Sequence, residues 1–87
     1  MSHGDRRKVS VMIYGEPYMV LGNDEPGRIE KLAVLVDKKM RLISQRNPRL
    51  STTKVAVLTA LNLADEMIRL KEEQQALAKL LEEEKDI

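Results

Sequence analysis

The run from Ser51 to about Glu84 constrains this chain most, because no glycine or proline interrupts about 33 residues. A helix of that length is a rod of roughly 50 Å. A chain of 87 residues is too short to fold back over such a rod. We therefore expect the far part of the helix to be covered by another molecule.

The run has two halves with different surfaces. Between Val55 and Ile68 apolar residues point almost all round the helix, as in a helix that is buried on most sides. Beyond Ile68 only a narrow apolar seam continues. One heptad register joins the halves, and it predicts self-association as a coiled coil. Its a and d positions are Ala56, Ala60, Leu63, Met67, Leu70, Gln74, Leu77 and Leu81.

Gln74 interrupts the apolar series at the a positions. A polar a residue sets the register or the number of strands at a cost in stability. An amphipathic helix lying on its own core is the other explanation of the pattern, but Leu77 and Leu81 would extend past any such core. Self-association therefore accounts better for the length of the seam.

Composition favours a small oligomeric protein without redox or membrane chemistry. A single domain of this size buries a modest share of its surface unless it oligomerises. There is no cysteine, which excludes disulfides, thiolate catalysis and Cys-ligated metals. No apolar stretch is long enough for a membrane span, and the polar start MSHGDRRK lacks the apolar core of a signal peptide. We expect a cytoplasmic protein with no membrane partner.

A β-hairpin is predicted ahead of the helices. Residues 8–13 alternate polar and β-branched side chains, with Val9, Val11 and Ile13 on one face. Gly and Pro at 14–17 indicate a turn, and residues 18–21 fit the returning strand. An isolated hairpin is marginal in water, so this one has to pack on a helix or pair with another subunit.

The first helix is predicted from Pro26 to about Arg46, with Asp24 or Glu25 as its cap. Its core face comprises Ile29, Ala33, Val36, Met40 and Ile43, widened by Leu32, Leu35 and Leu42. Asn47-Pro48 ends this helix, and Ser51 caps the long one. The short connection predicts that the two helices are antiparallel neighbours.

These elements define an α+β fold with an N-terminal β-hairpin, one amphipathic helix and one long C-terminal helix that forms an oligomeric coiled coil. We divide the chain into a disordered tail at 1–7, a globular head at 8–68 and a coiled-coil extension at 69–87.

Charge is unevenly distributed, although the net charge is only +1. Residues 28–54 hold eight basic and two acidic side chains, whereas residues 65–87 hold eight acidic and four basic ones. A basic head can steer an acidic partner, or its charge can simply be a solvated helix surface. Nucleic-acid binding by the same corner is an alternative, but it lacks interleaved aromatic residues for stacking on bases.

Catalytic constellations are absent from the sequence. The only histidine, His3, lies in the tail, and the glycines are too scattered for a nucleotide-binding loop. The paired carboxylates Asp65-Glu66 and Glu72-Glu73 lie beside basic residues and fit coiled-coil flanks. We therefore expect a protein that is not an enzyme and has no cofactor.

The chain resembles the ZapA family of bacterial cell-division proteins from about Lys8 to its end, in the shorter form found in Gram-positive bacteria. The resemblance is carried by the strand and turn VSVMIYGEPYMV, by NPRLSTTK, and by ALNLADE before the acidic coil. It implies a non-enzymatic protein that binds the tubulin-like GTPase FtsZ, bundles its protofilaments and supports the Z ring at midcell. It also implies a head that dimerises and a coiled coil that joins two dimers antiparallel into a tetramer.

The resemblance transfers no signature for the surface that binds FtsZ. From charge alone, we hypothesise that the basic residues around the corner between the two helices contribute to it. These residues are Lys38, Lys39, Arg41, Arg46, Arg49 and Lys54.

Overall fold

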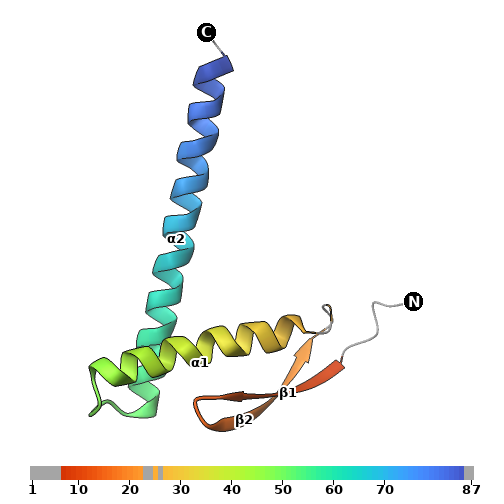
Figure 1. The fold of residues 1–87 in the computed structure, drawn as a ribbon, viewed down its shortest axis with the longest axis vertical. Coiled ribbons are helices and arrows are strands. Elements are labelled where there is room, and N and C mark those ends of the chain that lie inside the picture. The colour runs from red at the N-terminus through yellow and green to blue at the C-terminus, as the bar shows by residue number, and fades with distance from the viewer. Residues whose placement is uncertain (1–6, 23–24, 26, 86–87) are drawn as a thin grey trace.

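An antiparallel hairpin, a shorter helix and a long helix follow one another along the chain (Figure 1). The structure is a computed structural model, and it describes residues 7–22, 25 and 27–85. Its elements are β1 (Arg7–Ile13), β2 (Glu16–Gly22), α1 (Arg28–Arg46) and α2 (Thr52–Lys85). The predicted hairpin and both helices are confirmed. The predicted tail lies outside the described residues except for Arg7, which begins β1.

The hairpin turn is tighter than the sequence pattern indicated. It comprises only Tyr14 and Gly15, whose φ angles of 53° and 80° are both positive, as a type I′ turn requires. β2 therefore begins at Glu16, and Met12 lies opposite Pro17 in the register. Proline is tolerated there because each strand of a two-stranded sheet has a free edge.

One face of the hairpin packs on α1, as the alternation of side chains predicted. Val11 is buried, and Val9 and Ile13 are partly buried, while the residues between them are exposed. Ala33 lies at the centre of the α1 face that contacts the hairpin, and its small side chain is buried there. A Cβ atom at Gly22 would clash with the Ile29 side chain, so the end of β2 closely approaches the first turn of α1.

The start of α1 differs from the prediction. Its cap is Gly27, with φ of 94° and no side-chain hydrogen bond, so the predicted cap by the Glu25 side chain is wrong. Glu25 contributes its backbone carbonyl instead, which accepts a bond of 3.2 Å from the Arg28 amide. Asp24 and Pro26 lie outside the described residues. The predicted end is confirmed, because the Asn47 amide donates to the Ile43 carbonyl at 3.0 Å.

The start of α2 has the predicted cap. The Ser51 hydroxyl accepts a bond of 3.2 Å from the amide of Lys54, and the Ser51 carbonyl accepts one of 2.9 Å from the amide of Val55. These contacts satisfy amides that the first turn of a helix leaves free.

The expectation that α1 and α2 are antiparallel neighbours is wrong. Figure 1 shows α2 crossing α1 near the connection and then extending away from the head. The buried side chains of α2 are confined to its first turns, where Val55 is 0% exposed and Thr59 3%. Farther along the same side lies charged Glu66, which pairs with Lys39 of α1 rather than packing in an apolar interface.

The crossing gives the molecule an open shape, with extents of 55 × 46 × 15 Å. Its radius of gyration is 18.1 Å, whereas a compact domain of this length has one of about 12 Å. A single copy therefore does not enclose α2.

Replacing the Ser51 cap tests the start of α2. We expect Ser51→Ala to lower the free energy of unfolding by about 1 kcal/mol, because the Lys54 amide loses its acceptor. Ser51→Asn supplies another capping oxygen and should stay near the wild-type value. Denaturant titrations at one fixed protein concentration measure both, since self-association makes stability depend on concentration. Equal losses in the two variants would contradict the cap.

Candidate partner-binding surfaces

The six basic residues predicted to contact a partner lie in three different environments. Two of them form ion pairs within the chain, two line the corner between the helices, and two are exposed with no ion pair among the described residues. In that order they are Lys39 and Arg41, Arg46 and Arg49, and Lys38 and Lys54. The six residues therefore differ in how freely they can contact a partner.

Lys39 connects the two helices. Its ammonium group forms a hydrogen-bonded ion pair with the Glu66 carboxylate, which is 27 positions away in the chain. The Lys39 side chain is 25% exposed, so most of it is withdrawn from solvent. The pair joins α1 to the side of α2 just beyond the buried Val55 and Thr59, and it contributes to the angle at which α2 leaves the head.

Arg41 and Asp37 connect α1 to the hairpin turn. Asp37 accepts from the Tyr14 amide at 2.7 Å with one carboxylate oxygen and from the Arg41 Nε at 2.9 Å with the other. The Arg41 guanidinium also lies 5.8 Å from the centre of the Tyr14 ring, within the range of a cation–π contact. These contacts hold Tyr14 in a left-handed conformation that is costly for a residue other than glycine.

The polar contacts shift both ionisation equilibria at this link. The hydrogen bond from Arg41, followed by the one from the Tyr14 amide, lowers the pKa of Asp37 from its ordinary value of 3.8. The bond to Asp37 raises the pKa of Arg41. Both groups therefore stay charged at neutral pH. The sequence offered one sign of this link, the i,i+4 spacing of Asp37 and Arg41, but nothing local pointed to Tyr14.

The corner between the helices presents Arg46 and Arg49 beside a shallow hollow of about 340 Å³. Asn47, Pro48 and Leu50 complete its lining. Both arginines are exposed, so they are accessible to a partner that approaches this end of the head.

The residues predicted for self-association are nearly all exposed in one copy. Leu63, the exception, is partly buried, while Leu70 and Leu77 are each 59% exposed. A second apolar stripe, at Val57, Leu61 and Ile68, lies beside the seam on the proximal half of α2. The proximal half therefore offers a wide apolar surface and the distal half a narrow one.

The described part of the chain lacks two features that mark other protein classes. Residues 7–22, 25 and 27–85 contain no group of three or more metal-binding side chains. Neither of the two helices there carries an apolar stretch sufficient to cross a bilayer.

The fold thus defines a class of protein: a small α+β head carried on a long helix whose apolar surface is left uncovered by its own chain. Comparison with known proteins gives the family. The family model for cell division protein ZapA matches residues 9–86, and this chain belongs to the ZapA family.

Curated relatives agree over almost the whole length. A cell division protein ZapA from Geobacillus thermodenitrificans is 46% identical over 98% of this chain and 93% of its own. One from Bacillus mycoides is 42% identical over 85% of this chain and 83% of its own. Among solved structures, the ZapA mutant dimer from Geobacillus stearothermophilus is 41% identical, with a TM-score of 0.71 over 94% of this chain and 95% of that one.

Acid sensitivity tests the link between Asp37 and the turn. Because the pKa of Asp37 is lowered in the fold, its stabilising effect is full above the unfolded value of 3.8 and is lost as the pH falls through the lower folded value. The stability difference between wild type and Asp37→Asn should therefore be constant from about pH 5 upward and shrink below about pH 4.

Asp65→Asn is the matched control for this measurement. Asp65 accepts from Arg69 at 2.9 Å with the same i,i+4 spacing, but within the described residues it has no hydrogen bond or ion pair outside α2. Its removal should cost less, because exposed ion pairs within one helix contribute only about 0.3–0.5 kcal/mol. Denaturation at several pH values measures both variants, and equal costs would contradict a special role for Asp37.

The predicted seam is tested by charge insertion. Leu70→Glu or Leu77→Glu should shift the protein to smaller species, because each buries an unpaired charge in an apolar interface at a cost of several kcal/mol. Ala76→Glu places the same side chain at an outward c position and should leave the mass unchanged. Sedimentation equilibrium measures the mass. Wild-type mass for both leucine variants would refute this register.

Proposed function

We propose that this chain is a non-enzymatic cell-division protein that binds FtsZ and cross-links its protofilaments into bundles, promoting Z-ring assembly and stability at midcell. The observation that carries the proposal is membership of the ZapA family along nearly the whole chain. The relatives are named as cell division proteins. The proposed location is the cytoplasm at the division site.

Self-association is part of the proposal. The solved relative from Geobacillus stearothermophilus is described as a dimer. In this chain, burial of Val57, Leu61 and Ile68 by a second copy would remove a wide apolar surface from water, which is the main driving force of association. The narrower distal seam, with Leu70 and Leu77, then has the form of a coiled-coil contact between two dimers arranged antiparallel, giving a tetramer.

The geometry of such an oligomer suits a cross-linker. α2 spans 34 residues, or about 51 Å, and the head lies at its N-terminal end. Antiparallel pairing of distal halves would place heads at opposite ends of the assembly. Several separated heads can engage two filaments at once, and linked weak contacts add up to strong binding without any single tight one.

The basic residues of the head are the proposed contacts with the filament. Arg46 and Arg49 are the strongest of the six candidates, because they are exposed at the corner and no ion pair is recorded for them within the described residues. Lys38 and Lys54 are exposed as well. Lys39 already pairs with Glu66, so its contribution to binding would be indirect.

Charge reversal at the corner tests this surface. Arg46→Glu and Arg49→Glu should each weaken co-sedimentation with polymerised FtsZ by about tenfold, because each replaces an attractive charge by a repulsive one. Raised salt should weaken wild-type binding in the same assay. Arg69→Glu makes the same change on α2, away from the corner, and should bind normally.

Two results would count against the proposal. Unchanged pelleting of both corner variants would remove Arg46 and Arg49 from the binding surface. Failure of the wild-type protein to pellet with FtsZ filaments, together with a gel shift of duplex DNA, would instead favour nucleic-acid binding by the basic corner.

A further inference from the structure

We propose that the hollow between the hairpin turn and α1 binds one carboxylate side chain, an aspartate or a glutamate, on the surface of the FtsZ filament. This inference rests on the proposed function and deepens it, because it assigns a shaped site with a defined ligand chemistry to one part of a surface otherwise identified by charge.

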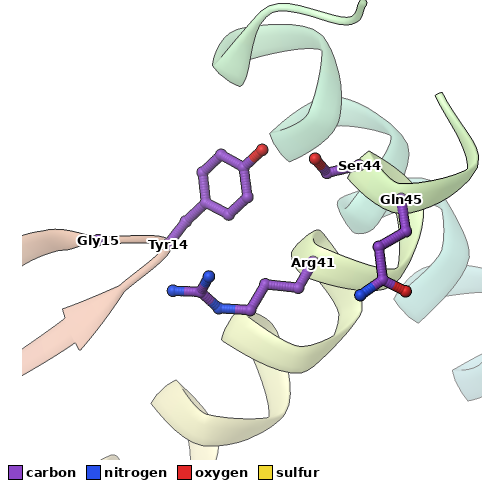
Figure 2. A pocket seen from close by; sticks show the side chains of 5 residues that line it. All are labelled: Tyr14, Gly15, Arg41, Ser44 and Gln45. Atoms are coloured by element: carbon purple, nitrogen blue, oxygen red, sulfur yellow. The ribbon is translucent and has the colours of Figure 1, made fainter. Parts of the chain in front are cut away.

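The hollow is formed by two elements that are far apart in the sequence. Its lining comes from the turn residues Tyr14 and Gly15 and from Arg41, Ser44 and Gln45 of α1, and its volume is about 330 Å³. Figure 2 shows the Tyr14 hydroxyl directed toward Ser44, with the Arg41 guanidinium below the tyrosine ring. The volume suits a single side chain better than a folded element.

The positive charge of the hollow is held in place. Arg41 uses its Nε to bind Asp37, and its planar group lies near the Tyr14 ring. Within the described residues, the terminal amino groups of Arg41 donate no recorded hydrogen bond, so they can form the two-pronged contact that a guanidinium makes with a carboxylate. Because Asp37 already orients the guanidinium, binding a ligand costs little conformational entropy at Arg41.

Three further polar groups line the hollow with Arg41. In the part of the chain that the structure describes, no hydrogen bond is recorded for the Tyr14 hydroxyl, the Ser44 hydroxyl or the Gln45 amide. All three can donate to an oxygen of the ligand. Together with Arg41 they form a site rich in donors, and none of the described residues that line it is acidic.

The charge balance favours a carboxylate over a more highly charged ligand. Asp37 lies beside Arg41 and offsets part of its charge, so the site has at most one positive charge to match. A single carboxylate fits that charge, whereas a phosphate group with nearly two negative charges does not. Gln45, which lines the hollow, and Arg46, which lines the corner, both lie in the last turn of α1, so the two sites share one end of that helix.

Adding one negative charge to the hollow tests the site. Gln45 is exposed, so Gln45→Glu should fold normally and weaken co-sedimentation with FtsZ filaments by about tenfold, the effect of one charge-assisted hydrogen bond replaced by repulsion. Gln75→Glu makes the same change on the exposed distal part of α2 and should bind within about twofold of wild type. Circular dichroism and sedimentation should be unchanged for both.

A substitution that preserves the positive charge distinguishes recognition by the geometry of the hollow from attraction by charge alone. Arg41→Lys keeps a cation that can still pair with Asp37, but it loses the planar fork, and it should bind FtsZ filaments about tenfold more weakly. Arg69→Lys makes the same change on α2, away from the hollow, where a lysine can still pair with Asp65, and it should retain binding.

The possible outcomes separate the two proposals. Equal losses in Gln45→Glu and Gln75→Glu, or wild-type binding by Gln45→Glu or by Arg41→Lys, would overturn the carboxylate site while leaving filament binding intact. Failure of the wild-type protein to pellet with filaments would overturn the proposed function and this site with it.

Discussion

The dominant constraint on this protein is apolar surface on α2 that its own chain cannot cover. Among the described side chains of α2, those of Val55 and Thr59 in the first turns are buried, whereas Leu61 is 63% exposed and the distal leucines are similarly open. Burial of apolar area is the main stabilising contribution to a small fold, and a head this size has little core of its own. A partner that covers α2 would therefore complete the fold and also determine the oligomeric state. The solved relative with the same architecture is described as a dimer, which agrees with this.

α1 organises the head through polar contacts on each of two sides. Toward the hairpin, the Asp37 carboxylate accepts a hydrogen bond from the Tyr14 amide. This bond stabilises a turn whose backbone conformation is otherwise unfavourable. Toward the rod, Lys39 binds Glu66. Apolar packing holds the hairpin and α2 against α1, but it does not fix their orientation, because its strength depends on buried area and not on direction. The hydrogen-bonded contacts have preferred geometries, and they restrict how the turn and the rod are oriented on α1.

Two kinds of basic residue follow from this arrangement. Lys39 maintains the structure of the head, and Arg46 and Arg49 are available at its surface. Arg41 belongs to both kinds, because one side of its guanidinium binds Asp37 and the other faces the hollow beside Tyr14. A basic residue can therefore act on a partner directly or by shaping the surface that the partner meets, and composition alone does not separate these roles.

The sequence by itself determined the elements whose causes are local. The hairpin face at Val11, the end of α1 at Asn47 and the Ser51 cap of α2 all follow from side-chain period, proline and capping within a few residues. Tertiary structure decided the features that depend on residues distant in the sequence. The positive φ of Tyr14 is supported by Asp37, 23 positions away, and the crossing of α1 and α2 brings Lys39 and Glu66 into contact. Local patterns specify each element from its nearest neighbours, whereas the angle between elements is chosen by contacts that exist only after they have packed.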